Sequence, residues 1–507
     1  MTDSNPDFVV VGGGAAGAIV AARLSEDPSA TVVLLEAGGD ERRPDVQTPE
    51  AWPTMLGSDA DWAAETVPQS VLGRTVPAPR GRILGGSGSI NVMAHLRGHR
   101  DDYDRWAQLG ADGWGWDAML PFHKLTEDVP DGDPAFRGRG GPLRPRPIVD
   151  PHPLSIAHVE AAVHAGLPRA ADLNDGDLRG AALHDLLIDS GHRRQSSATA
   201  YLRPAMDRPN LTVVTGAQAA SLVFDGTRCV GVDYLVDGVG HTVRAGRETV
   251  LSAGAVATAR LLLGSGIGPV ADLEKLGIEV VAESDEVGAN LQDHILLAGV
   301  RVRTDVALPP PSGNFAESTL FTTLDGGPGR PDLQICNVQV DYHTAAQEPA
   351  GQAFTFGIGL MRPQARGTIR LASADPFAPP LIDPRYLSER ADVDAAVAGV
   401  ELADRLFATG AFSAWGGRCD ASDWLARDRA GLESLIADGV SSFFHLSGTA
   451  RMGSDDAAVV GPDLKVRGVD GVRVADASVF PEVVSCNTQA AAMAVGEKVA
   501  ALILGRC

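Results

Sequence analysis

The chain has 507 residues, of which 44% are hydrophobic and 21% charged, and its formal net charge is −22. This composition is typical of a globular protein, and the length predicts two or more domains rather than one hydrophobic core. The acidic balance argues against nucleic acid and anionic membrane as partners, because both are bound through clustered Lys and Arg.

The cysteines and the N-terminus favour a reducing compartment. The five cysteines are odd in number, widely spaced and without a CxxC pair, which indicates neither a disulfide framework nor a zinc site. The start, MTDSNPDFVVVGGG, lacks the basic residues and long apolar core of a secretory signal, and no window is apolar enough to span a bilayer. We therefore expect a cytoplasmic protein that uses no metal.

The first forty residues predict a βαβ unit. FVVV at 8–11 is typical of a short buried strand, GGGAAG of a glycine turn, and AIVAARLSE of an amphipathic helix. TVVLLE at 31–36 is the next strand. This order predicts a parallel sheet.

The next region carries a glycine-serine loop at 81–91, GRILGGSGSIN, with too few side chains to pack a core. Its backbone is expected to lie against another part of the molecule. Residues 101–125 are predicted to be helical, with an interruption at GADGWGW. The Pro-, Gly- and Arg-rich stretch 130–148 is interpreted as a surface connection between domains.

The second half mixes both kinds of element. Short runs between 211 and 251 predict strands joined by turns, and ATARLLLGSG predicts a helix after them. Residues 294–385 combine strand-like runs, such as LQICNVQVDY and FTFGIGLM, with prolines, and 388–440 are mostly helical. Near the C-terminus, GVRVADAS predicts a strand and turn, and NTQAAAMAVGEKVAALIL a capped helix.

A nucleotide-binding fingerprint lies in the βαβ unit. Gly12, Gly14 and Gly17 permit, in turn, a tight turn, close approach of the backbone to a pyrophosphate, and close packing of helix on strand. The helix N-terminus would stabilise the diphosphate, and Glu36, at the end of the second strand, would accept hydrogen bonds from a ribose diol. The pattern predicts an ADP-containing dinucleotide, FAD or NAD. Without an arginine beside Glu36, NADP is disfavoured.

Six stretches, in the family's order, resemble the glucose-methanol-choline (GMC) family of FAD-dependent oxidoreductases. They are VVVGGGAAG with LLEAGGD, GRILGGSGSINVMAHLRGHRDDYDRW, AGAVATARLLLGSGIG, VGANLQDH, HLSGTARMG, and RVADASVFP with NTQAAAMAVGEKVA. Any one of them could arise by chance, but six in order identify the chain as a member of the family.

The resemblance implies an α/β fold, with a Rossmann-like FAD-binding domain and a second α+β substrate-binding (cap) domain. We expect residues 1–150, 195–300 and 440–507 to form the FAD-binding domain, and 151–194 and 301–439 the substrate-binding domain. The implied partners are a small-molecule alcohol and oxygen or another electron acceptor. The oligomeric state is not predicted.

The resemblance also implies where FAD would bind. Ile90 stands where members with covalently attached flavin carry histidine, so FAD is expected to be non-covalent. Backbone amides at the start of the last helix would stabilise negative charge on the reduced flavin. The positions that match the family's FAD contacts are Gly12, Gly14, Ala15, Ala16, Gly17, Glu36, Ala37, Gly38, Arg82, Leu84, Gly85, Gly86, Ser87, Asn91, Met93, Ala94, Ala219, Ala253, Gly254, Asp476, Ala477, Asn487, Thr488 and Gln489.

His445 is the candidate catalytic base, because histidine titrates near neutrality and can take the proton of an alcohol. A lone histidine beside two phenylalanines is more often a core residue, but the HxxGTxxMG context favours catalysis. In the family the matching position is catalytic, and its partner here is Asn487. The amide of Asn487 can hold the substrate oxygen but cannot act as a base. Phe444, His445 and Asn487 are the expected substrate contacts.

Other candidates carry weaker signals. His294 is interpreted as structural or positioning, and His95 as lining the site or packing with equal weight. Cys486 is expected to be a small buried residue. The residues that could wall an apolar cavity are Phe443, Phe444, Phe354, Phe356, Phe315 and Met361.

The sequence leaves the reaction partly open. Oxidase and dehydrogenase are equally compatible, and the alcohol could be benzylic, furanic, pyridoxine-like, an amino-sugar or choline-like. A non-redox lyase of the same fold, resembling hydroxynitrile lyases, is the alternative function. A flavin-free binding protein conflicts with the number of nucleotide-contact motifs.

Overall fold

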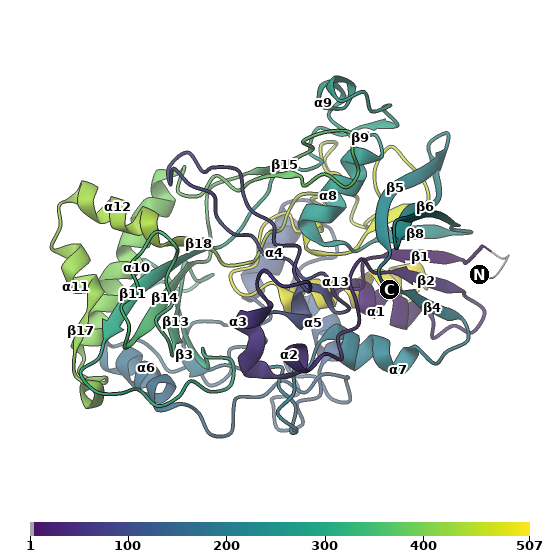
Figure 1. Cartoon of the computed structure of the whole chain (residues 1–507). Coiled ribbons are helices and arrows are strands. Elements are labelled where there is room, and N and C mark those ends of the chain that lie inside the picture. The colour runs from purple at the N-terminus through teal and green to yellow at the C-terminus, as the bar shows by residue number, and fades with distance from the viewer. Residues whose placement is uncertain (1–4, 507) are drawn as a thin grey trace.

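The computed structural model describes residues 5–506, so Cys507 and the first four residues of the predicted FAD-binding domain lie outside the described part. A five-stranded parallel sheet forms one half of the molecule (Figure 1). Its strands in spatial order are β19 (Val472–Val474), β8 (Glu248–Leu251), β1 (Phe8–Val11), β2 (Val32–Leu35) and β4 (Leu211–Val214). The strands come from distant parts of the chain.

Helices and a smaller sheet surround the parallel sheet. All four residues of β1 are buried, which is expected of a central parallel strand covered on both faces. The elements that pack around it are α1 (Gly17–Leu24), α8 (Gly254–Gly264), α13 (Gln489–Ile503), and the antiparallel strands β5 (Gln218–Asp225), β6 (Arg228–Val236) and β7 (Val239–Arg244). The predicted strands between 211 and 251 and the helices that follow β1 and β8 are confirmed.

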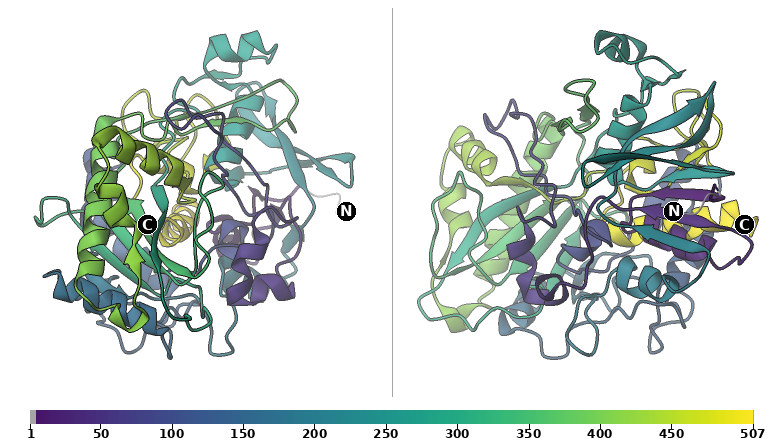
Figure 2. Two further views of the ribbon diagram at one scale, coloured as in Figure 1. Left: turned by 60° about the vertical axis from the view of Figure 1, so that its left-hand side comes forward. Right: turned by 45° about the vertical axis from the view of Figure 1, so that its right-hand side comes forward.

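A second, antiparallel sheet of seven strands forms the other half (Figures 1 and 2). Its strands in spatial order are β17 (Arg418–Cys419), β11 (Ile295–Arg303), β14 (Ala353–Leu360), β13 (Leu333–Val338), β12 (Ser318–Thr322) and β3 (Gly180–Leu183), and β18 (Val440–Ser442) also pairs with β11. The mixed architecture is the predicted one. The expected boundary between the two domains at residue 300 falls inside strand β11, which runs without interruption from Ile295 to Arg303.

Four helices contact the second sheet, and the last three of them supply the helical stretch predicted at 388–440. They are α6 (Pro153–His164), α10 (Arg390–Ala408), α11 (Asp420–Leu425) and α12 (Arg429–Gly439). Figure 1 shows α10, α11 and α12 at the end of the molecule that lies farthest from the parallel sheet. These helices and one face of the sheet share a hydrophobic core.

The residues of strand β14 show how the two faces of this sheet differ. Phe354, Phe356 and Ile358 pack in the core under the helices. Gly357, between them, is on the opposite face, because successive side chains of a strand alternate. The face turned away from the helices therefore has a place without a side chain at its centre.

The remaining elements are short connections and flanking helices. Helices α4 (Arg100–Gln108) and α5 (Trp116–Thr126) confirm the interrupted helical stretch. The other elements are α2 (Pro44–Gln47), α3 (Trp52–Met55), α7 (Arg203–Ala205), α9 (Val270–Lys275), β9 (Ile267–Gly268), β10 (Ala282–Glu283), β15 (Thr368–Arg370) and β16 (Leu381–Asp383). No helix in the described part is both long and apolar enough to span a bilayer.

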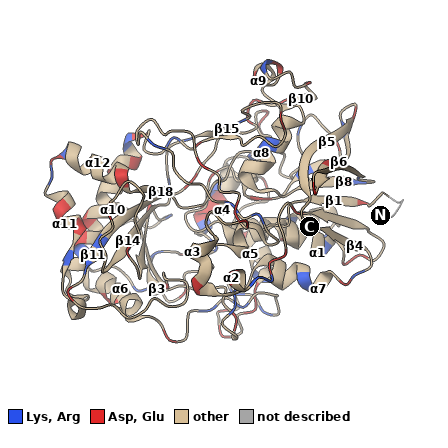
Figure 3. Ribbon diagram, viewed as in Figure 1, with Lys and Arg blue, Asp and Glu red and all other residues tan. Residues whose placement is uncertain are grey.

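Charged residues of both signs are interspersed over the two halves (Figure 3). One charged residue differs from the prediction for the surface connection at 130–148. Arg137 is buried, where it pairs with Glu127, Asp172 and Asp185 at N–O distances of 2.6–2.9 Å. This connection therefore carries a buried ionic cluster, because its arginine finds three carboxylates in the protein.

Candidate active site

A cavity of about 700 Å³ runs between the two sheets. At one end it is lined by the glycine turn after β1 and by the loops that follow β2, β8 and β19. At the other end it meets the glycine-bearing face of the second sheet. The residues around His445 and the start of α13 also line it. The cavity thus connects the nucleotide fingerprint with the candidate base.

The three glycines of the fingerprint have different surroundings. Gly12 has a φ of +98°, and a Cβ there would lie 2.5 Å from the Ser252 carbonyl oxygen. At Gly17 a Cβ would lie 2.0 Å from the Gly12 carbonyl oxygen, which is the close helix packing expected of this position. Gly14 differs, because a Cβ would meet no protein atom closer than 3.9 Å and this residue lines the cavity. The missing side chain of Gly14 therefore leaves space in the cavity, whereas Gly12 and Gly17 are required by the packing of the protein itself.

The glycine-serine loop at 81–91 lies against this turn, as the sequence predicted. Gly86 has a φ of +54°, and a Cβ there would come within 2.8 Å of the Gly14 Cα. Two backbones therefore approach each other beside the cavity, which only glycine permits at this distance. The approach places Gly86 and Ser87 in the cavity wall.

The Glu36 side chain hydrogen-bonds to the glycine turn after β1 and to the loop after β2. One carboxylate oxygen accepts a hydrogen bond from the Gly13 amide and the other from the Gly38 amide, both at 2.8 Å. Burial raises the pKa of Glu36 to about 7, although these two hydrogen bonds oppose the shift. Each oxygen retains a lone pair, and the residue lines the cavity, so the carboxylate has the capacity to accept hydrogen bonds from a ribose diol.

Asp476 is more fully engaged by the protein. One carboxylate oxygen accepts from the Ser478 amide and hydroxyl, and the other from the Gly254 amide and the Thr258 hydroxyl, at 2.5–2.8 Å. These four bonds tie the loop after β19 to the start of α8. The side chain is thereby saturated, so a ligand would meet the backbone of this loop rather than the carboxylate.

The predicted cofactor positions divide into two groups. Those that line the cavity are Gly12, Gly14, Ala15, Ala16, Glu36, Ala37, Gly86, Ser87, Asn91, Ala94, Ala219, Ala253, Gly254, Asp476, Ala477, Asn487, Thr488 and Gln489. Those that lie outside its lining are Gly17, Gly38, Arg82, Leu84, Gly85 and Met93. The second group supports the wall: a Cβ at Gly38, for example, would lie 1.9 Å from the Arg82 carbonyl oxygen.

The start of α13 opens onto the cavity. Thr488, at the N-cap position, makes no side-chain capping hydrogen bond, so the predicted capped helix is corrected at this end. The side chain of Gln489 instead accepts a hydrogen bond from Asn91 at 2.5 Å. Two buried atoms here, Oδ1 of Asn487 and Nε2 of Gln489, have no hydrogen-bond partner among the described residues. The uncapped terminus and these atoms are suited to an anionic or polar ligand.

His445 and Asn487 meet in the cavity although they are 42 positions apart. The Asn487 amide nitrogen lies 3.2 Å from His445 Nε2. On the other side of the ring, His445 Nδ1 lies 2.8 Å from Nδ1 of His294. Burial first, then His294 and the positive charge of Arg80, lower the pKa of His445 well below its ordinary value. The imidazole is therefore neutral at physiological pH.

These contacts define which nitrogen of His445 carries the proton. An amide NH₂ only donates, so Nε2 of His445 accepts from Asn487 and must be unprotonated. The single proton of the neutral ring is then on Nδ1, where it is donated to His294. The lone pair of a base thus faces the cavity, and His294 sets the tautomer.

Comparison with known proteins shows the family of this chain. Two family models, both described as GMC oxidoreductase, match residues 6–296 and 363–496. This chain belongs to the GMC oxidoreductase family. A GMC-type oxidoreductase of Mycobacterium bovis is 40% identical over 529 residues, covering 99% of each chain. The oxygen-dependent choline dehydrogenase of Brucella canis is 36% identical over 530 residues, covering 99% of this chain and 96% of the relative.

Solved structures show the same family resemblance over the whole chain. The crystal structure of pyridoxine 4-oxidase from Mesorbium loti matches with a TM-score of 0.93 and 33% identity, covering 98% of each chain. Formate oxidase of Aspergillus oryzae matches with a TM-score of 0.89 and 28% identity, covering 100% of this chain and 99% of the other. The GMC oxidoreductase described here is therefore an FAD-dependent oxidoreductase with the predicted fold.

The nucleotide end of this GMC oxidoreductase fits FAD. Gly14 and Gly86 form a cradle that a Cβ at residue 14 would enter. The uncapped start of α13 adds backbone donors, and the unpartnered amide atoms of Asn487 and Gln489 add polar contacts beside His445. A long cavity that joins such a cradle to the candidate catalytic pair, His445 and Asn487, suits a cofactor with a diphosphate at one end and a redox ring at the other.

Two residues that position His445 were not predicted. Asp293 accepts hydrogen bonds from the His445 amide, the Ser442 hydroxyl and the Tyr386 hydroxyl at 2.5–2.7 Å. Its only sequence signal was its place beside His294 in the VGANLQDH stretch. The carboxylate therefore fixes the backbone of the base.

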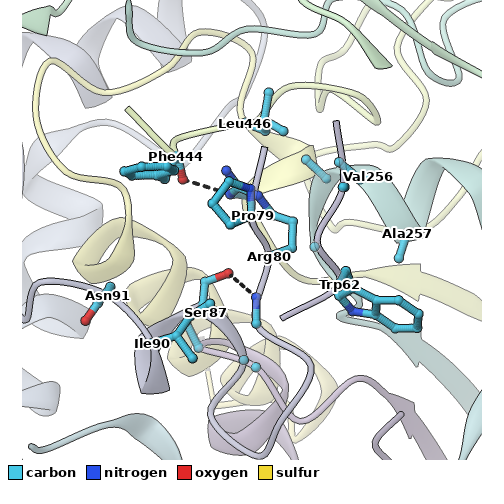
Figure 4. A pocket seen from close by; sticks show the side chains of 18 of the residues that line it. Trp62, Pro79, Arg80, Ser87, Ile90, Asn91, Val256, Ala257, Phe444 and Leu446 are labelled. Carbon is cyan, nitrogen blue, oxygen red and sulfur yellow. Dashed lines mark hydrogen bonds between the residues drawn. The ribbon is translucent and has the colours of Figure 1, made fainter. Parts of the chain in front are cut away.

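Arg80 is the second unpredicted residue. Its Nη1 donates a hydrogen bond to the Phe444 carbonyl at 2.7 Å, and Figure 4 shows this bond with Trp62 nearby. Nε and Nη2 are buried and have no partner among the described residues. Arg80 thus places a permanent positive charge beside His445, and its sequence signal was only its position before the loop at 81–91.

Among the candidate wall residues, only Phe443 and Phe444 line the cavity. The Phe443 ring lies 4.9 Å from that of His445. Phe354 and Phe356 instead pack under the helices, because they are on the other face of β14. The remaining candidates also lie elsewhere: Phe315 packs edge-on against Trp52, Met361 is in the core, Cys486 is fully buried, and His95 lies 3.5 Å from Glu127 in the ionic cluster.

Proposed function

We propose that this GMC oxidoreductase oxidises a small primary alcohol to an aldehyde, with His445 as the base. The observation that carries the proposal is the unprotonated Nε2 of a buried, neutral His445 that faces the cavity next to Asn487. Relatives named choline dehydrogenase and pyridoxine 4-oxidase support an alcohol as substrate without specifying which one.

The side chains suggest how the substrate would be held. The substrate hydroxyl takes the place at Nε2 that the Asn487 amide occupies here, and donates its proton to that nitrogen. The Asn487 amide then donates to the substrate oxygen and fixes its position. His294 accepts the Nδ1 hydrogen throughout, so the ring does not change tautomer. FAD, when bound, supplies the acceptor for the hydride of the reacting carbon.

The absence of a histidine at position 90 supports non-covalent FAD. Ile90 lines the cavity near the end of the glycine-serine loop, and its side chain offers no nucleophile for attachment to the flavin. The electron acceptor is oxygen or another oxidant.

The decisive experiment records the absorption spectrum of the purified protein anaerobically before and after a panel of small alcohols is added. We expect a yellow protein that one of these alcohols bleaches, and readmitted air separates an oxidase from a dehydrogenase. A yellow protein that no alcohol bleaches, but that cleaves a cyanohydrin, would establish the lyase instead.

His294 should act as a positioning residue for His445. Replacing His294 with phenylalanine removes the acceptor for the Nδ1 hydrogen of His445. The proton of His445 can then move to Nε2, and a protonated Nε2 cannot accept the proton of the substrate. We expect kcat to fall by roughly 10²-fold with KM nearly unchanged. The measurement is steady-state kinetics with the alcohol identified above.

His294→Asn is the matched control, because its amide oxygen can lie near the position of the lost Nδ1 and accept the same hydrogen. It should recover most of the lost kcat. Equal activity of the Phe variant and the wild type would show that the tautomer of His445 does not depend on His294.

A further inference from the structure

The cavity face of the second sheet carries no charge among the described residues. The side chains that β11, β13 and β14 place in the cavity wall are Leu296, Gln334, Cys336 and Val338, and Gly357 lies between them. The acidic residues of the lining lie elsewhere: Glu36 and Asp476 hold the nucleotide loops, and Glu65 is exposed. A quaternary ammonium would find no carboxylate on this face.

Gly357 makes this face flat at its centre. A Cβ at this position would lie 3.5 Å from both the Leu296 Cδ1 and the Val338 Cγ2, in ordinary contact. The fold therefore does not require glycine here, in contrast to Gly359, where a Cβ would lie 2.6 Å from Met361 and Phe443. The missing side chain enlarges the cavity instead. With Phe443 and Phe444 also in the wall, the space suits a planar ring.

Two polar side chains at the edge of this face have unused hydrogen-bonding atoms. His184, which follows β3, is 3% exposed, and neither ring nitrogen has a partner among the described residues. The amide nitrogen of Gln334 donates to the Thr319 hydroxyl at 3.0 Å, which leaves Oε1 unpartnered in a side chain that is 1% exposed. Both residues line the cavity. Buried polar atoms without partners are costly, so they indicate a ligand that supplies the missing bonds.

We propose that His184 and Gln334 form a recognition subsite for a second polar group of the substrate. The substrate class is a neutral arylmethanol with a ring hydroxyl or a similar donor, as opposed to a cationic alcohol. Its ring lies on the Gly357 face, its hydroxymethyl group points to His445, and its ring hydroxyl forms a hydrogen bond in the subsite that His184 and Gln334 line. The proposal rests on the proposed alcohol oxidation and names the substrates of that site.

Neutral His184 fits this role. Burial lowers the pKa of His184 to about 4, so at physiological pH the ring has one donor and one acceptor nitrogen. A hydroxyl group can satisfy either one. A carboxylate substituent would instead have to be desolvated beside a neutral imidazole and an amide oxygen, which disfavours anionic substrates.

The test compares benzyl alcohol with its 3- and 4-hydroxy derivatives and with choline. Anaerobic stopped-flow measures the rate of flavin reduction for each, and the wild type should prefer one hydroxybenzyl alcohol over benzyl alcohol by about tenfold or more. Gln334→Met and His184→Leu should each reduce this preference by about tenfold, because the ring hydroxyl loses a hydrogen-bond partner. A wild type without the preference, or variants that keep it, would overturn the proposal.

A binding measurement separates this proposal from the proposed function. The affinities for benzaldehyde and for 3- and 4-hydroxybenzaldehyde are measured from the perturbation of the flavin spectrum, without turnover. The subsite predicts tighter binding of a hydroxybenzaldehyde by the wild type and loss of that difference in Gln334→Met. This result can hold when no alcohol reduces the flavin, in which case only the proposed oxidation fails. Equal affinities in both proteins would overturn the subsite.

Two further variants control for fold and shape. His123 is a buried histidine on α5 outside the cavity lining, where Nε2 contacts the Tyr103 hydroxyl at 2.8 Å, so His123→Leu should leave the substrate preference unchanged. Gly357→Ala adds a methyl group that the fold tolerates and should weaken binding of the ring substrates by about tenfold. Undiminished ring binding in Gly357→Ala would show that the ring does not lie on this face.

Discussion

His445→Ala should lower the rate constant of flavin reduction by about 10³-fold while FAD remains bound, because the cavity loses its base. His445 Nε2 is the unprotonated nitrogen beside Asn487, and the alanine variant offers nothing in its place to take the substrate proton. The fold of the loop should survive, because Asp293 holds residue 445 through its backbone amide. The measurement is anaerobic stopped-flow reduction by the best alcohol of the panel.

His445→Gln separates the loss of the base from the loss of a hydrogen bond. A glutamine amide can still contact the substrate oxygen but cannot take its proton. We expect this variant to bind the aldehyde product like the wild type and to reduce the flavin as slowly as His445→Ala. Reduction at the wild-type rate in either variant would remove His445 from the mechanism.

The local patterns predicted the elements well but not the faces of the second sheet. The stretch FTFGIGLM is predominantly apolar, and a strand buried on both sides shows no alternation of polarity that would identify the cavity side. The sequence therefore predicts Phe354 and Phe356 as candidate cavity residues, and the structure places them on the other face. Gly357, which follows Phe356, was the better signal, since a strand position without a side chain leaves room for a ligand.

The sequence predicted only those site residues that lie in a recognisable linear motif. His445 and Asn487 are 42 positions apart, and only the family resemblance connected them before the fold did. Asp293 and Arg80 act through contacts that the chain makes on folding, so no pattern in the sequence marked their roles. The same holds for Arg137, whose three carboxylate partners come from other segments and turn an expected surface residue into a buried one.

Gly14→Ala and Gly12→Ala should fail in different ways, although the two glycines are neighbours in one motif. At Gly14 the new methyl group meets no protein atom within 3.9 Å and enters the cavity, so the apoprotein should keep its melting temperature. Its affinity for FAD should fall by about 10²-fold, because the methyl group occupies space that the diphosphate needs.

At Gly12 the same methyl group would lie 2.5 Å from the Ser252 carbonyl oxygen, and the φ of +98° is strained for any other residue. That variant should lose stability by about 1–3 kcal/mol from backbone strain alone, and its apoprotein should melt at a lower temperature. Thermal unfolding of the two apoproteins, with titration of FAD into each, separates the effects. Wild-type FAD affinity in Gly14→Ala would mean that the diphosphate is bound elsewhere, since no other role of Gly14 requires the missing side chain.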